Sequence, residues 1–185
     1  MSDARSNKKQ ISRFKLMIAA AVAVAIFGGL TFVWMQFDLE GRASAMVVSR
    51  GGTTSIHALR PGWVPDDVDD AWFTWYERIV VFDLSGSAVT DDDLTSLEGL
   101  IYLTRLNLDN TSISDAGLVH LVEARYLADL SLSGTSITDA GLKHLASCRK
   151  LQSLNIENTR VTARGVKELQ AALPQCHITW TSPSP

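Results

Sequence analysis

Apolar residues recur along the second half of the chain with a period of 24 residues. Leu103, Leu127 and Leu151 mark one position of the repeat. The same spacing holds at further positions, namely Leu106, Leu130 and Leu154; Leu108, Leu132 and Ile156; Ile113, Ile137 and Val161; Leu118, Leu142 and Val166; and Leu121, Leu145 and Leu169. A looser copy precedes them over residues 79–97. The chain therefore contains about four copies of one structural unit.

Within one repeat the apolar spacing changes from that of a strand to that of a helix. Leu130 and Leu132 alternate with polar residues, whereas Leu142 and Leu145 are three apart. A single repeat cannot bury its apolar face, so stacked neighbours must share one core. We expect an α/β solenoid of short parallel strands and short helices over residues 79–173. Ile178 and Trp180 continue the spacing and predict a closing strand in a C-terminal cap and tail, residues 174–185.

Two polar columns accompany the apolar ones. Thr111, Thr135 and Thr159, with Ser87, are predicted to be buried and to bond the backbone of a turn. The pairs Thr90-Asp91, Ser114-Asp115 and Thr138-Asp139 stand just before the helical part, where they suit helix starts. The alternative is a metal-binding row of the three carboxylates. Capping is favoured, because the fourth repeat has Ala163 in that column.

The repeat resembles one class of leucine-rich repeat. Residues 111–118 (TSISDAGL) and 135–142 (TSITDAGL) are similar to the T-x-I-T-D-x-G-L motif of GALA-type bacterial repeats. Related cysteine-containing repeats occur in F-box proteins, which select substrates for ubiquitin ligases; no F-box-like segment precedes the repeats here. The tail at 173–180 also resembles the closing segment of the bacterial family. The resemblance implies a leucine-rich-repeat solenoid and is nearly silent on function, because one fold hosts many roles.

The first 37 residues have the composition of a membrane anchor. Residues 16–35 form an apolar run of 20 residues, which matches the ~30 Å hydrocarbon thickness of a bilayer. The preceding tail, residues 1–15, carries a net charge of +4. Because positive flanks stay in the cytoplasm, we expect one transmembrane helix at 16–37, used as a signal anchor, with the repeats outside the cytoplasm. The alternative is a signal peptide cleaved after Ala45, in the sequence Ala43-Ser44-Ala45.

The segment between anchor and repeats is predicted as a stalk followed by a cap. Residues 38–62 are polar and rich in turn residues, as a stalk would be. Residues 63–78 include Trp72, Trp75 and Tyr76 at helical spacing, which favours an N-terminal cap over the open solenoid. The alternative for the Trp72–Tyr76 cluster is an aromatic platform for a carbohydrate or another ligand, which would make the protein a sensing ectodomain.

The net charge and the remaining reactive residues limit the classes of function that we expect for the chain. Beyond residue 15 the chain has 12 Lys and Arg against 19 Asp and Glu, so we expect neither nucleic-acid binding nor docking on anionic lipid. His120 and His144 share a column with Glu168, but ~8–10 Å between helix axes is far for one metal ion. Cys148 and Cys176 are candidates for a disulfide. No catalytic residue, cofactor or metal is expected.

The predicted binding surface is the strand face, where the residues between the leucines point away from the core. It is polar and mildly acidic, so a polar or basic protein partner is expected, and Arg105 could simply pair with Asp129. The predicted binding residues are Asp83, Arg105, Asn107, Asp109, Asp129, Ser131, Asn155 and Glu157. Together these features predict a non-enzymatic, single-pass membrane protein that acts as an adaptor or scaffold.

Overall fold

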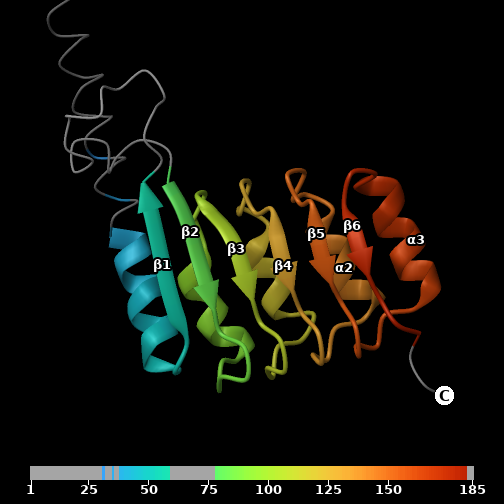
Figure 1. Ribbon diagram of the computed structural model, residues 1–185, viewed down its shortest axis with the longest axis horizontal. Coiled ribbons are helices and arrows are strands. Elements are labelled where there is room, and N and C mark those ends of the chain that lie inside the picture. The colour runs from blue at the N-terminus through green and yellow to red at the C-terminus, as the bar shows by residue number, and fades with distance from the viewer. Residues whose placement is uncertain (1–30, 32–34, 36–37, 59–77, 183–185) are drawn as a thin grey trace, which may run out of the picture. The chain divides into compact units, whose positions relative to one another are not determined.

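The computed structural model describes residues 31, 35, 38–58 and 78–182. The chain divides into two units, residues 1–38 and 39–185, and the described residues lie almost wholly in the second. Figure 1 shows this second unit as a row of strands with helical segments behind them. No helix within these described ranges is long and apolar enough to cross a membrane. The span predicted at 16–37 lies outside them, apart from Thr31 and Met35.

One six-stranded sheet, in the order β1-β2-β3-β4-β5-β6, forms one layer of the second unit. β1 is antiparallel to β2, and every later neighbour is parallel. The strands are β1 (Thr53–Ala58), β2 (Arg78–Asp83), β3 (Leu103–Asn107), β4 (Asp129–Ser131), β5 (Ser153–Asn155) and β6 (His177–Thr179). The four repeats begin at β2, β3, β4 and β5, so the predicted parallel α/β arrangement is present.

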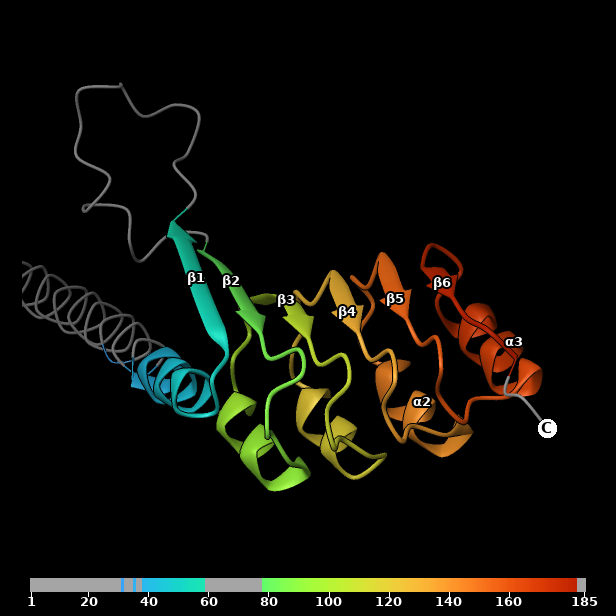
Figure 2. The same ribbon diagram turned by 60° about the horizontal axis from the view of Figure 1, so that its bottom comes forward.

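A helical segment follows each of the four repeat strands. Figure 2 shows these segments together on one side of the sheet. They are the 3-10 helices η2 (Asp91–Leu97) and η3 (Gly117–Leu121) and the α-helices α2 (Asp139–Leu145) and α3 (Ala163–Ala172). α2 starts where the Thr138 side chain accepts a hydrogen bond from the Ala140 N–H, as the sequence predicted for this column.

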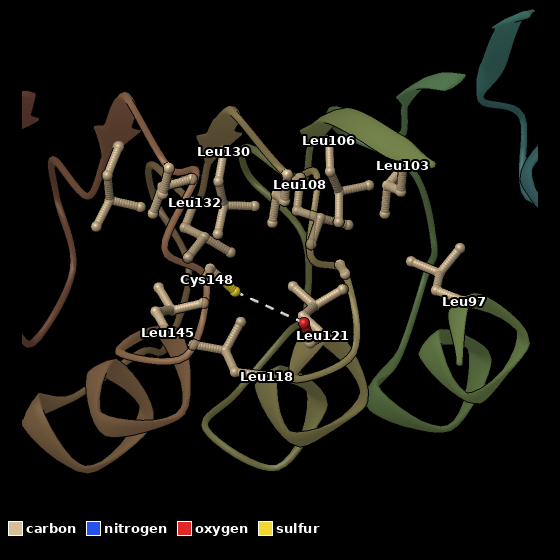
Figure 3. Packing of buried hydrophobic residues seen from close by; sticks show 14 of the residues in the cluster. Leu97, Leu103, Leu106, Leu108, Leu118, Leu121, Leu130, Leu132, Leu145 and Cys148 are labelled. Atoms are coloured by element: carbon tan, nitrogen blue, oxygen red, sulfur yellow. Dashed lines mark hydrogen bonds between the residues drawn. The ribbon is translucent and has the colours of Figure 1, made fainter. Parts of the chain in front are cut away.

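The core fills the space between the strands and the helical segments. Leu103, Leu127 and Leu151 are at most 2% exposed, and the other periodic apolar residues are buried with them, except Val166, which is partly buried. Figure 3 shows leucines from successive repeats packed side by side. Each contributes about 1.5–3 kcal/mol through burial. No repeat has a core of its own, because each leucine packs against its counterparts in the repeats before and after it.

The turn after each strand requires a left-handed backbone. Gly86, Asn110, Gly134 and Asn158 occupy equivalent positions and have φ of 64°, 54°, 69° and 55°. Glycine and asparagine are the residues that adopt this conformation most readily. The chain can therefore reverse after every strand at the same point of the repeat.

The N-terminal end of the array is closed by residues 38–58, which corrects the predicted stalk. Residues 38–49 form a helix, and its Ala43 and Val47 are fully buried in the common core. The next segment, β1, pairs with β2 from Thr53 opposite Asp83 to Ala58 opposite Arg78. The rest of the predicted stalk and the cap predicted at 63–78 lie outside the described residues, apart from Arg78.

The C-terminal end is closed as the sequence predicted. Ile178 in β6 pairs with Leu154 in β5. Trp180 packs against the core, and its indole Nε1 donates to the Val161 carbonyl at 2.9 Å. The side-chain amide of Gln170 in α3 donates hydrogen bonds to the carbonyls of Leu173 and Cys176, so these two carbonyls are satisfied at the C-terminal end of the array.

Candidate binding face and the contacts between repeats

The strand face of β2–β5 has a shallow hollow of ≈ 300 Å³. It is lined by residues of four adjacent strands, in which outward side chains alternate with buried ones because successive strand residues point to opposite sides of the sheet. The lining residues are Val81, Phe82, Asp83, Arg105, Leu106, Asn107, Asp129, Leu130, Ser131, Ser153 and Asn155. The structure thus brings six of the eight predicted binding residues together, while Asp109 and Glu157 lie outside the hollow.

Arg105 and Asp129 form an ion pair in the middle of this face. They are register partners on β3 and β4, and Arg105 Nε lies 2.7 Å from Asp129 Oδ2. The sequence-based suggestion that these two side chains pair is confirmed. Both remain well exposed, at 64% and 42%. A pair this exposed adds at most about 1 kcal/mol to stability, and a partner can still contact both groups.

Other predicted binding residues mainly hold the turns that follow the strands. Asp83, Asn107 and Asn155 each accept a hydrogen bond from the backbone N–H two residues further on, at 3.0–3.1 Å. Asp109 accepts hydrogen bonds from the Ser131 hydroxyl at 2.6 Å and the Ser133 N–H at 2.7 Å. These groups are already hydrogen-bonded, which leaves Arg105, Asp129 and the exposed Ser153 as the polar groups most open to a partner.

The carboxylates of Asp91, Asp115 and Asp139, which we call the aspartate ladder, bind the start of the next repeat's helix. Asp115 accepts from the Thr138 N–H at 2.8 Å and from its hydroxyl at 2.6 Å. Asp91 and Asp139 contact Ser114 and Thr162 in the same way. The sequence predicted a role at helix starts but not that each carboxylate serves the following repeat.

The aspartate ladder also explains the glycine of each repeat. A Cβ added at Gly141 would collide with Asp115 Oδ1, and Gly117 and Gly165 face Asp91 and Asp139 in the same way. The metal-binding alternative is not favoured, because hydrogen bonds from the next repeat already occupy these carboxylates. Across the ranges that the structure describes, no three His, Cys, Asp or Glu side chains gather as metal ligands would.

The first repeat has no preceding repeat to provide an aspartate, so a different residue binds the start of its helix η2. Asp93, within the same repeat, accepts from the Thr90 N–H and hydroxyl at 2.9 Å each. Arg50 donates to Asp93 from Nε at 3.1 Å and from Nη2 at 2.5 Å. Burial acts to raise the pKa of Asp93, but the bonds from Thr90 and Arg50 outweigh it and hold that pKa below its ordinary value.

The buried threonine column is confirmed. The Thr111, Thr135 and Thr159 hydroxyls donate to carbonyls three residues earlier at 2.6, 2.6 and 2.7 Å. Ser87 is different, since its buried hydroxyl has no hydrogen-bond partner among the described residues. The first repeat is thus the least regular at this position too.

The candidate disulfide is absent, because Cys148 and Cys176 are both free and buried. Each backbone N–H donates to the carbonyl three residues earlier, Cys148 to Leu145 at 3.0 Å and Cys176 to Leu173 at 3.1 Å. The Cys148 Sγ instead faces the Leu121 carbonyl at 3.6 Å (Figure 3). Burial raises the pKa of both thiols, which keeps them protonated and weakly reactive.

The histidine column is part of the outer helical surface. His120 Nδ1 lies 2.6 Å from Glu98 Oε1, one repeat earlier. Glu168 pairs with Arg164 within α3. The carboxylate beside His120 is therefore Glu98 and not Glu168, whereas a metal site shared by this column would need Glu168. The aromatic cluster Trp72–Tyr76 lies outside the described residues.

One surface feature was missed at the sequence level. The loops leading into β3, β4 and β5 carry Tyr102, Tyr126 and Lys150 at the same position of the repeat. The two tyrosine rings stack with centroids 5.9 Å apart. Arg125 and Arg149 precede the second and third of these residues and are exposed. Comparing polar positions at the 24-residue period, as was done for the apolar ones, would have revealed this row.

Comparison with known proteins supports the repeats. The family model described as Leucine Rich repeat matches residues 99–122, 124–146 and 147–169. Three consecutive segments of the chain are therefore similar to leucine-rich repeats. No curated protein sequence matches the chain.

Two solved structures are similar in part. Internalin C2 of Listeria monocytogenes is 26% identical with a TM-score of 0.40, over 49% of this chain and 40% of that one. A leucine-rich-repeat protein of Leptospira interrogans is 15% identical with a TM-score of 0.35, over 46% of this chain and 27% of that one. The aligned part of the chain thus spans less than half the length of either protein.

Proposed function

We propose that the protein is a membrane-anchored adaptor or scaffold whose strand face binds a protein partner outside the cytoplasm. The observation that carries this proposal is the hollow on β2–β5, where the Arg105–Asp129 pair and Ser153 are open to solvent. Leucine-rich-repeat proteins commonly mediate protein–protein interaction and are typically non-enzymatic scaffolds. Four carboxylates and one guanidinium among the predicted binding residues favour a polar or basic partner.

The repeat type that we propose is GALA-like. In support, the T-D-x-G positions each have a structural role: Thr138 caps α2, Asp139 binds the next repeat, and Gly141 leaves room for Asp115. A motif with three interlocking roles is specific to this way of stacking repeats.

The proposed anchor is the uncleaved apolar segment at 16–37. Its support is the run of 20 apolar residues after a tail of net charge +4, which also favours a cytoplasmic N-terminus. Cleavage after Ala45 would separate Ala43 from Val47, and both are fully buried in the core of the repeats. The folded domain therefore needs the segment that a signal peptidase would remove.

The binding face is tested with two matched variants of the full-length protein. Arg105→Ala/Asp129→Ala removes the exposed pair on the strand face, and Arg164→Ala/Glu168→Ala removes a pair of similar exposure on α3. The three proteins are immobilised in detergent and exposed to membrane extract, and bound proteins are quantified by mass spectrometry. We expect a partner retained by the parent and by the α3 variant but reduced at least about fivefold by the strand-face variant. Equal retention by all three would contradict the proposal.

A further inference from the structure

The loops at which the repeat strands start form a distinct edge of the sheet. Two consecutive residues at the same positions of the 24-residue repeat, taken from the loops before β3, β4 and β5, give a row of six. We call it the strand-start row: Ile101, Tyr102, Arg125, Tyr126, Arg149 and Lys150. Because β3, β4 and β5 are parallel neighbours, these loops lie side by side (Figure 1). The row contains two aromatic residues, three cations and no carboxylate.

Exposed apolar side chains gather beside this row. Within the described ranges, five large apolar residues are exposed, and Val119, Val122 and Tyr126 are three of them, at 48%, 41% and 53%. Val119 lies in the middle of η3, Val122 directly follows that helix, and Tyr126 lies in the loop between η3 and β4. At the position of Val119 the later repeats have Lys143 and Lys167. Apolar groups that are exposed together mark an interaction surface.

The charge of the loops before β4 and β5 opposes that of the chain. Arg125, Arg149 and Lys150 are exposed, and none forms an ion pair with another described residue. Glu123 is the nearest carboxylate along the chain. At physiological salt the Debye length is ≈ 8 Å, so a partner senses local charge more than net charge. The sequence-level expectation against anionic lipid rested on net charge and missed this edge.

The chain reaches the second unit at this same edge. The helix of residues 38–49 leads through a short turn into β1, which starts opposite the end of β2, so the helix itself starts at the strand-start edge. A Cβ at Gly99, in the loop before Tyr102, would lie 3.3 Å from Leu39 Cδ1. Leu39 follows Met35, the end of the apolar run, by four positions in the sequence, which limits the distance between their Cα atoms to about 14 Å.

We propose that the strand-start row, with Val119 and Val122, rests on an anionic lipid bilayer. The inference builds on the membrane anchor of the proposed function, which would keep the repeats close to a bilayer because only a few residues join the apolar run to Leu39. Tyrosine favours the headgroup region, and each Lys or Arg near an anionic surface adds about fivefold to affinity. A second, weak membrane contact of this kind fixes the orientation of a tethered domain.

The test uses the full-length protein in nanodiscs of phosphatidylcholine alone or with about one third phosphatidylglycerol. Hydrogen–deuterium exchange follows the hydrogen-bonded amides of Arg125, Leu127, Arg149 and Leu151. Arg125→Glu/Arg149→Glu reverses two charges in the row. Arg160→Glu/Lys167→Glu reverses two exposed charges outside it, with the same change in net charge.

We expect these amides to exchange about tenfold more slowly in the anionic discs than in the neutral discs. The row variant should lose this protection, and the control should keep it. Equal exchange in both lipids would overturn the inference, as would protection that depends on the number of protein copies per disc, which would point to a second copy.

Flotation of the same proteins with vesicles separates this inference from the anchor. Flotation with neutral and anionic vesicles, without lipid-dependent protection of the row, would leave the anchor intact and reject the bilayer contact. Flotation with anionic vesicles alone, lost in Arg125→Glu/Arg149→Glu, would support the contact and reject the anchor. No flotation with either vesicle would reject both.

Discussion

The first repeat starts its helix with different hydrogen bonds from those of the later repeats, and the fourth repeat provides no aspartate for a following helix. In the interior, Asp115 of the second repeat binds Thr138 of the third. The first repeat has no predecessor, so Asp93 binds its own Thr90 and is held by Arg50. The fourth has no successor repeat, and Ala163 stands in the aspartate column. The difference shows that the sequence motif describes a contact between repeats rather than a property of one repeat.

We expect the largest difference between interior and end for core substitutions, measured as the loss in the free energy of unfolding. Leu132→Ala removes a fully buried side chain with repeats on both sides, and should lower the free energy of unfolding by about 2–5 kcal/mol. Ile178→Ala, in half-buried β6, should cost about 1–2 kcal/mol. Urea unfolding followed by circular dichroism measures both. Equal losses would mean that the C-terminal end is as tightly packed as the interior.

A smaller effect is expected from the aspartate ladder. Asp115→Ala leaves the Thr138 N–H without its acceptor and should lower the free energy of unfolding by about 1–3 kcal/mol. Asp92→Ala, at an exposed residue of η2, is the matched control and should change it by less than about 0.5 kcal/mol. Ala163→Asp should add no stability, since no helix follows it. A gain there would show that the carboxylate acts within its own repeat.

The smallest expected effect is on the pH dependence of stability, and it comes from Asp93 at the N-terminal end of the array. The pKa of Asp93 is below its ordinary value of 3.8 when the protein is folded, so the ionised group stabilises the fold above that value. This contribution is lost as the pH falls through the lower, folded pKa. Between about pH 6 and about pH 2, Asp93→Asn should therefore lose about 0.5–1 kcal/mol less stability than the parent. Chemical unfolding across that range measures the difference, and parallel curves would exclude the effect.

The repeats could be predicted from the sequence because burial leaves a periodic signal. The leucine columns, the buried threonines and the closing Trp180 all follow from spacing alone. Asp109 shows the limit of reasoning from spacing. Its position after a strand predicts an outward side chain, but it does not predict the hydrogen bonds that this side chain makes. Only the structure shows that the Ser131 hydroxyl and the Ser133 N–H of the next strand donate to it. Which polar groups remain open to a partner depends on such contacts.

The predicted stalk shows a second limit. Leu39, Ala43 and Val47 recur every four residues, which is helical spacing. This helical signal was present, but the polar, turn-rich residues 50–55 that follow it favoured a stalk. β1 carries little apolar alternation of its own, and its place in the sheet depends on pairing with β2. Elements that cap a repeat array need not share its period.

The aspartate ladder makes the array directional. Every carboxylate is provided by one repeat and used by the next one along the chain. An extra 24-residue copy inserted between Asp115 and Thr138 would therefore meet a complete set of partners on both sides. The same copy added after Ala163 would find no carboxylate to bind its first helical turn. Gene duplication can thus lengthen this protein from within, while its C-terminal boundary stays fixed.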